Sequence, residues 1–210
     1  MTPTLPGFGT ALPTGFGATC DEYVEWLVAD IARLGEPVDL VGHDWGSILV
    51  LRIALVRPDL VRTLAAGSGP LDLEYQWHET AVLWQTPEIG EQLMTIFGGE
   101  PAIAALVAGG LSQEYATEAV ARIDDRMRST ILKLYRSAVD VNPRWAPDLD
   151  AVRCPALVVW PVDDPFVERR FGARLAARLD GDLLEVDGGH WWPTAQPEKV
   201  TAALEKLWAR

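Results

Sequence analysis

The feature that most constrains this chain is a short apolar segment that ends in two closely spaced glycines around an acidic residue. Residues 38–43 predict a buried strand, and Gly46 to Arg57 predict a mostly buried helix that Pro58 ends. A strand that enters a helix through small-x-acid-x-small must turn sharply, and its central residue then has a strained backbone. We therefore expect Asp44 to stand above the carboxyl end of this strand.

Other segments repeat the alternation of strand and helix. Thr19 and Glu22 predict a capping box that starts an amphipathic helix, which Gly35 ends. Further strands are predicted at 61–66, 156–160 and 183–186, and further helices at 167–179 and 197–208. Strands separated by helices favour a parallel sheet, so the predicted fold class is α/β. Residues 1–18, rich in glycine, proline and threonine, predict a loop.

A block without strand signals interrupts this alternation. Within it, helices are predicted at 77–83, 88–97 and 118–140. We interpret residues 70–145 as an inserted helical cap, and residues 1–69 with 146–210 as the core of the fold.

Composition narrows the class of partner. The chain has 210 residues, of which 49% are hydrophobic, enough for one core with a modest insertion. A net charge of -12 argues against nucleic acid and against an anionic membrane surface, and favours a neutral or cationic substrate. No apolar run reaches membrane-spanning length, and the start does not resemble a signal peptide.

The two cysteines give no sign of a metal or disulfide framework. Cys20 and Cys154 are far apart and have no histidine cluster nearby. We therefore predict no metal, no cofactor and a cytoplasmic location.

The residues that follow the predicted strands suggest a reaction. A carboxylate such as Asp44 can displace a leaving group at saturated carbon and form an alkyl ester. The amide of Trp45, at a helix start, can stabilise a developing oxyanion. Hydrolysis of the ester needs a base, for which His190 is the candidate, and an acid that orients the base, for which Asp163 and Asp164 are candidates.

Structural roles could also explain each of these residues. An aspartate between strand and helix is commonly an N-cap, and His190 could be an ordinary loop histidine. Asp163 and Asp164, followed by Pro165, could form only a turn and a helix cap. The order nucleophile, acid, base, each directly after a strand, favours the catalytic interpretation over all three.

These residues resemble a known superfamily. Gly42-His43-Asp44-Trp45-Gly46 is similar to the nucleophile elbow of epoxide hydrolases and haloalkane dehalogenases, the aspartate-nucleophile branch of the α/β-hydrolase superfamily. Pro6-Gly7-Phe8-Gly9 resembles the loop after the fourth strand, and Gly188-Gly189-His190 resembles the loop of the catalytic histidine. The resemblance covers nearly the whole chain, and it implies Asp164 as the acid.

The resemblance also implies a small neutral organic substrate and water as the reactants. Tyr135 is similar to a cap tyrosine that protonates the opening oxirane oxygen of an epoxide. In a dehalogenase, the indole N–H groups of Trp45 with Trp77 or Trp84 would instead hold the halide. Packing of an aromatic cap is the alternative explanation for Tyr135, Trp77 and Trp84. We favour the epoxide over the haloalkane.

The resemblance further implies strands before Pro6 that this chain does not contain. We therefore expect an N-terminally truncated α/β-hydrolase fold that lacks one oxyanion donor, and a homo-oligomer or a complementing N-terminal fragment that covers the free sheet edge. A catalytically impaired remnant that binds a ligand or partner is the alternative function. An esterase is disfavoured because Asp44 stands where acyl transfer needs serine.

Overall fold

The computed structural model describes residues 1–210, which form two compact units. The helical unit comprises Met1–Tyr23 and Gln76–Asp140, and the sheet unit comprises Val24–Tyr75 and Val141–Arg210. None of the helices combines the length and the apolar content that a membrane crossing requires. The sheet unit contains all the residues predicted as nucleophile, acid and base, so its fold positions the candidate site.

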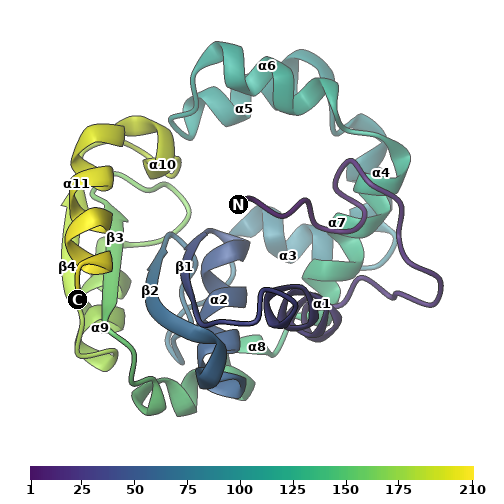
Figure 1. Cartoon of the computed structure of the whole chain (residues 1–210). Coiled ribbons are helices and arrows are strands. Elements are labelled where there is room, and N and C mark those ends of the chain that lie inside the picture. Colours follow the sequence, from purple (N-terminus) through teal and green to yellow (C-terminus); the bar gives the residue numbers. More distant parts are fainter. The chain divides into compact units, whose positions relative to one another are not determined.

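The sheet unit is built on four parallel strands, which confirms the predicted α/β class. In chain order they are β1 (Val38–His43), β2 (Val61–Gly67), β3 (Ala156–Pro161) and β4 (Asp182–Val186). They lie side by side in the order β1-β2-β3-β4 (Figure 1). In this register His43 pairs with Gly67, and Pro161 pairs with Val186, so all four carboxyl ends lie at one edge of the sheet.

The helices of this unit connect and cover the strands. They are the part of α1 (Cys20–Ala32) from Val24 on, α2 (Trp45–Val56), η1 (Pro58–Leu60), α8 (Val141–Trp145), η2 (Ala146–Ala151), α9 (Arg169–Arg178), α10 (Trp192–Ala195) and α11 (Pro197–Trp208). Helix α2 packs against β1 and β2. Successive side chains of β3 point to opposite faces of the sheet. Val159 packs in one core with Val200 of α11, whereas Trp160 lies against Gly172 of α9, so α11 and α9 cover opposite faces.

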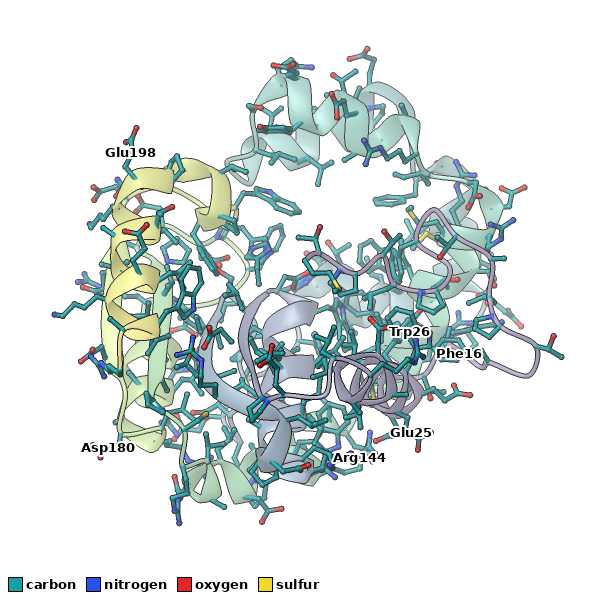
Figure 2. The ribbon with its side chains drawn as sticks, in the orientation of Figure 1. Phe16, Glu25, Trp26, Arg144, Asp180 and Glu198 are labelled. Carbon is teal, nitrogen blue, oxygen red and sulfur yellow. The ribbon has the colours of Figure 1, made fainter.

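The interior of the sheet unit is strongly apolar, as a parallel sheet covered on both faces requires. All six residues of β3 are buried, and Trp160 has no exposed surface. Charged side chains remain outside: Glu25, Asp180 and Glu198 are exposed at the surface (Figure 2). These acidic side chains are therefore on the surface, whereas Asp72 and the side chain of Asp164 are buried.

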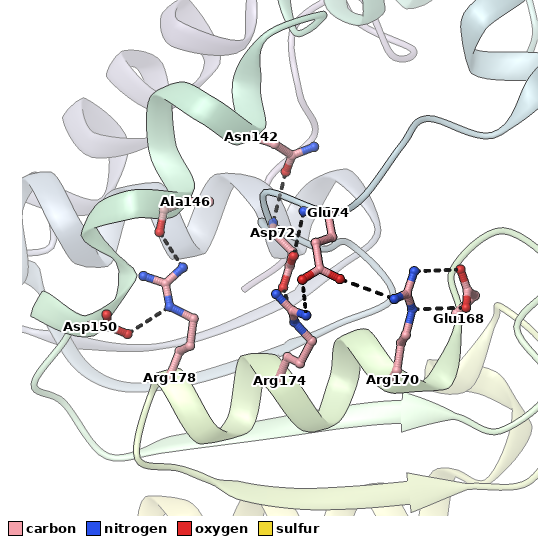
Figure 3. Close-up of polar contacts among 9 residues, drawn as sticks. All are labelled: Asp72, Glu74, Asn142, Ala146, Asp150, Glu168, Arg170, Arg174 and Arg178. Atoms are coloured by element: carbon pink, nitrogen blue, oxygen red, sulfur yellow. Dashed lines mark hydrogen bonds and ion pairs between the residues drawn. The ribbon is translucent and has the colours of Figure 1, made fainter.

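Arginines of α9 bind residues of the loop after β2 and residues of η2 (Figure 3). The guanidinium of Arg174 binds the Asp72 carboxylate at 2.8 Å and the Glu74 carboxylate at 2.7 Å, both in the loop after β2. Arg178 binds Asp150 at 2.8 Å and donates to the carbonyl of Ala146 at 2.6 Å. Since α9 follows the loop that carries Asp164, these contacts hold that loop relative to β2.

The helical unit corrects two predictions of the sequence. It contains α3 (Glu79–Gln85), α4 (Ile89–Ile96), α5 (Gly99–Ala108), α6 (Gln113–Ala121) and α7 (Asp125–Ser137). The single helix predicted at 118–140 is wrong, because Asp124 accepts a hydrogen bond from the amide of Met127 and caps a new helix. Helix α5 was not predicted, since glycines flank it and its apolar residues have no clear period.

The first residues pack with the helical unit, whereas the sequence grouped residues 1–69 with the core. They contain no helix or strand before Cys20, as predicted. The buried hydroxyl of Tyr23 donates to the carbonyl of Pro6 at 2.6 Å, and the amide of Cys20 donates to Ser137 of α7 at 2.8 Å. Assignment of residues 1–69 with 146–210 to a hydrolase core, and of 70–145 to a cap, stays a prediction.

Candidate active site

Asp44 occupies the turn between β1 and α2 in a conformation that side chains rarely adopt. Its backbone angles are φ 54° and ψ −123°, and its amide donates to the carbonyl of Gly67 at 3.0 Å. Although Asp44 precedes a helix, its side chain makes no capping hydrogen bond. Its carboxylate is 41% exposed. A residue held under strain with its side chain accessible fits a reactive group better than it fits a cap.

Glycines make this turn possible, but not both of the two that the motif suggests. A Cβ at Gly42 would collide with the backbone carbonyl of Gly46 and would lie 2.6 Å from Val50. A Cβ at Gly46 would meet no atom within 4 Å. The strand and helix therefore approach closely at Gly42, and Gly46 is not required for steric reasons.

The acid loop follows β3, and it turns Asp164 inward and leaves Asp163 exposed. The Asp164 side chain has no exposed surface, and its Oδ2 lies 3.0 Å from Nδ1 of His190. Its Oδ1 accepts from the amides of Phe166 at 2.9 Å and Val167 at 3.2 Å. Asp164 thus does form a local turn, as the structural alternative expected, and it contacts His190 as well.

These contacts keep the Asp164 carboxylate charged. Burial raises its pKa, but the hydrogen bond and charge of His190, the Phe166 amide and the Ser68 hydroxyl together outweigh burial and lower the pKa below the usual value. A charged, buried acceptor at Nδ1 favours the His190 tautomer whose proton is on Nδ1.

His190 lies between the two carboxylates in the loop after β4. Its side chain is 6% exposed, and its Nε2 is 3.9 Å from Oδ1 of Asp44. Burial lowers the pKa of His190, but the hydrogen bond to Asp164 and the charges of Asp44 and Asp164 raise it above the usual value overall. The imidazole packs edge-on against Phe166, with ring centroids 5.0 Å apart. A nitrogen that points at Asp44 can take a proton from water beside it.

His43, the last residue of β1, contacts the backbone of His190. Its Nε2 lies 2.9 Å from the carbonyl oxygen of His190, and the two rings have centroids 4.7 Å apart. Burial lowers the pKa of His43, so the imidazole is neutral and donates this hydrogen bond from Nε2. The histidine loop is therefore attached directly to the elbow.

Trp45 is the first residue of α2, and its side chain is largely buried. The N-terminus of a helix carries partial positive charge. This end of α2 therefore offers a favourable field for a negative oxygen bound beside Asp44.

The remaining predicted residues belong to the helical unit, where they form an aromatic cluster. The ring of Tyr135 lies 4.9 Å from that of Trp84 and 5.6 Å from that of Trp77, between centroids. The indole N–H of Trp77 donates to the carbonyl of Ala138 at 3.3 Å. Tyr135 is 8% exposed. Packing thus explains much of this cluster.

Sequence reasoning missed two polar residues of the site, His43 and Ser68. Ser68 follows β2 and is 1% exposed, and its hydroxyl donates to the carbonyl oxygen of His190 at 3.4 Å. The available signal was its position: Gly67-Ser68-Gly69 comes directly after a strand, as do the elbow and the acid loop.

Comparison with known proteins identifies the family of this chain. The model of the Alpha/beta hydrolase family matches residues 1–204. The (E)-2-((N-methylformamido)methylene)succinate hydrolase of Acinetobacter baylyi is 24% identical over 205 residues, which cover 96% of this chain and 76% of that protein. Epoxide hydrolase 2 of Siraitia grosvenorii is 40% identical over 67 residues, which cover 30% of this chain and 21% of that protein.

A solved structure shows the same fold. Haloalkane dehalogenase DbeA from Bradyrhizobium elkani superposes with a TM-score of 0.77 and 25% sequence identity, over 98% of this chain and 80% of that one. The parallel sheet, the strained turn at its edge, the family match along nearly the whole sequence and hydrolases among the relatives lead to one conclusion: this chain is a hydrolase of the alpha/beta hydrolase family.

Proposed function

We propose that this hydrolase uses Asp44 as a nucleophile toward saturated carbon, with His190 and Asp164 as the base and its supporting acid. The observation that carries the proposal is the line of contacts from Asp164 through Nδ1 of His190 to Nε2, which lies 3.9 Å from the Asp44 carboxylate. Asp44 itself is exposed, strained and free of any capping role.

The first step forms an ester and opens the substrate. An oxygen of Asp44 attacks an epoxide carbon, a new carbon–oxygen bond forms, and the ring carbon–oxygen bond breaks with its electron pair on the leaving oxygen. That oxygen needs a proton, for which Tyr135 is the proposed donor.

The second step releases the product. His190 removes a proton from water at Nε2, and the resulting hydroxide attacks the carbonyl carbon of the Asp44 ester. The bond between the carbonyl carbon and the alkyl oxygen breaks, and that oxygen takes the proton held by His190 and leaves as part of the diol. The proton of the resulting Asp44 carboxylic acid returns to Tyr135, which restores the carboxylate. The positive end of α2 at Trp45 stabilises the negative oxygen of the intermediate. Asp164 holds the charge that His190 gains during this step.

An epoxide is the preferred substrate class. The indole N–H of Trp77 is already engaged with the Ala138 carbonyl, which weakens its use as a halide ligand. Trp84 and Trp45 remain candidates for substrate contact. A haloalkane is the second candidate, favoured by the 25% identity and TM-score of 0.77 with a haloalkane dehalogenase.

Trapping the ester tests the nucleophile directly. His190→Gln should form the Asp44 ester and fail to hydrolyse it, because only the second step needs the base. Incubation with styrene oxide or 1-bromobutane, followed by peptide mass spectrometry, should find an adduct on the Asp44 peptide. The control is Asp44→Asn with His190→Gln, which should show none.

Product analysis with the unaltered chain separates the substrates. Diol from styrene oxide supports the epoxide, and bromide release from 1-bromobutane supports the haloalkane. Normal turnover by Asp44→Asn would contradict the nucleophile assignment. No product together with no adduct would favour a remnant that binds a ligand or partner without chemistry.

A further inference from the structure

His43 is the last residue of β1, and its ring contacts three consecutive residues of the chain after β4. The centroid of the ring lies 4.7 Å from that of His190. The rings of Trp191 and Trp192 follow at 5.4 Å and 5.7 Å. A single side chain next to Asp44 therefore packs against the whole segment that carries the proposed base.

A hydrogen bond to the backbone accompanies these ring contacts. Nε2 of His43 lies 2.9 Å from the carbonyl oxygen of His190. A carbonyl oxygen only accepts, so Nε2 of His43 carries the hydrogen of this bond. A neutral ring with its proton on Nε2 and a protonated ring both meet that requirement. The bond therefore does not depend on the charge of His43.

The other donors to this carbonyl differ from His43 in where they belong. The amide of Trp192 donates to it at 3.0 Å, but Trp192 is two residues along the same segment and moves with it. The hydroxyl of Ser68 reaches it at 3.4 Å, which is a weaker contact. His43 is bonded directly to Asp44, and consecutive Cα atoms are only about 3.8 Å apart. The bond from His43 thus joins the base to the nucleophile by the shortest covalent route.

His190 therefore has two separate supports. The Asp164 carboxylate holds Nδ1 of its imidazole at 3.0 Å, and His43 holds its backbone. Nε2 of the same imidazole lies 3.9 Å from the carboxylate of Asp44. A shift of the His190 backbone would change this distance, and a misplacement of about 1 Å can lower a rate roughly 10²-fold.

We propose that His43 is a positioning residue that holds the backbone of His190 and thereby sets the distance between the base and Asp44. This inference rests on the function proposed above. Nε2 of His43 is occupied by the carbonyl, so His43 acts through His190 and not on the substrate. It should affect hydrolysis of the ester more than its formation, because only hydrolysis needs the base.

The test compares three substitutions of His43 that differ in where they place a donor. The amide nitrogen of glutamine can reach the place of Nε2, that of asparagine reaches only the place of Nδ1, and leucine has no donor. The variants are His43→Gln, His43→Asn and His43→Leu. Since asparagine and glutamine are chemically alike, this pair decides the test even if His43→Leu folds poorly.

Thr63→Val is the control for a lost hydrogen bond in the same sheet. The Thr63 hydroxyl is buried and donates to Asp39 at 2.7 Å, toward the amino ends of β2 and β1 and away from the site. This variant should lower the melting temperature and leave the rates of ester formation and hydrolysis unchanged.

Single-turnover mass spectrometry with styrene oxide or 1-bromobutane measures both rates. His43→Asn and His43→Leu should slow hydrolysis of the Asp44 ester roughly 10–100-fold, while ester formation stays within about threefold. His43→Gln should keep hydrolysis within about threefold of the unaltered chain. Equal losses in all three variants, or a loss in none, would overturn the proposal.

Hydrogen exchange of the Trp192 amide gives a second readout that needs no activity. This amide shares the His190 carbonyl with His43, so it should exchange faster in His43→Asn and His43→Leu but not in His43→Gln. That pattern in a chain that forms no ester would support the positioning role and count against the proposed function alone. Exchange that is the same in all three variants and the unaltered chain would overturn the proposal.

Discussion

Two aspartates of the site show how environment distinguishes identical side chains. Asp44 is 41% exposed, whereas the Asp164 side chain is fully buried and surrounded by donors. A nucleophile must reach its substrate, and a supporting acid must stay charged and fixed. The chemical difference lies in burial and hydrogen bonding and not in the residue type.

The adjacent aspartates provide a residue-scale prediction. Asp164→Asn should slow ester hydrolysis by roughly 10²–10⁴-fold, because His190 loses the charge that supports its protonated form. Asp163→Asn, one residue away and exposed, should leave the rate within about twofold. Single-turnover measurement of the rate of ester hydrolysis in both variants tests this assignment. Equal losses of rate would contradict Asp164 as the acid.

The pH dependence follows from His190. Its pKa is raised above the usual 6.5, and only the neutral imidazole can accept a proton from water. Ester hydrolysis should therefore rise with pH as the imidazole loses its proton and then level off. His43, whose pKa is lowered, stays neutral over that range and adds no second step to the pH profile of the rate. A stopped-flow rate that is flat from about pH 5 to 9 would refute His190 as the base.

At the scale of elements, the elbow depends on one close approach between β1 and α2. Gly42→Ala should destabilise the fold by about 1–3 kcal/mol, since its Cβ would displace the Gly46 carbonyl or Val50. Gly46→Ala should be neutral or slightly stabilising, because its Cβ meets open space and alanine favours helix. Urea unfolding of both variants measures the difference, and a larger loss at Gly46 would be the contrary result.

Helix α9 depends on its arginines to a different extent along its length (Figure 3). Arg178 is 25% exposed and binds Asp150 and two backbone carbonyls. Arg170 is 51% exposed, pairs with the Glu74 and Glu168 carboxylates and lies over the ring of Phe171. Arg178→Ala should cost about 1–3 kcal/mol, because it leaves carbonyls without donors. Arg170→Ala should have a smaller effect on the melting temperature and should lose even that effect in high salt.

At the scale of the whole molecule, the strand that leads to Asp44 is an edge of the sheet. β1 pairs with β2 only, and it is less buried than β2 or β3. Parallel strands are normally covered on both faces, and an open edge can pair with another chain. Self-association through β1 is therefore the expected behaviour at high concentration.

A lysine on that edge should reduce association. Val41 on β1 is 44% exposed, and Val56 at the end of α2 is 42% exposed, so the two form a matched pair. Val41→Lys should shift the weight-average mass toward monomer in sedimentation experiments, since edge lysines oppose strand pairing. Val56→Lys should not. Equal effects would point to general solubility and not to the edge.

The sequence alone determined the features that depend on neighbouring residues. All four strands, helix α11 and the capping box of Thr19 with Glu22 follow from local periodicity and capping chemistry. The turn at Asp44 follows from its flanking residues in the same way. These features are local, so the order of residues is sufficient to specify them.

Only the tertiary structure decided which side chains meet. Asp163 and Asp164 have the same sequence surroundings, and the path of the loop turns one inward toward His190. Ser68 and His43 became part of the site because β2 and β1 end at the same edge of the sheet as the acid and histidine loops. The contacts of Ser68 and His43 with His190 join residues more than a hundred positions apart, and the packing of the parallel strands specifies them where no local pattern can.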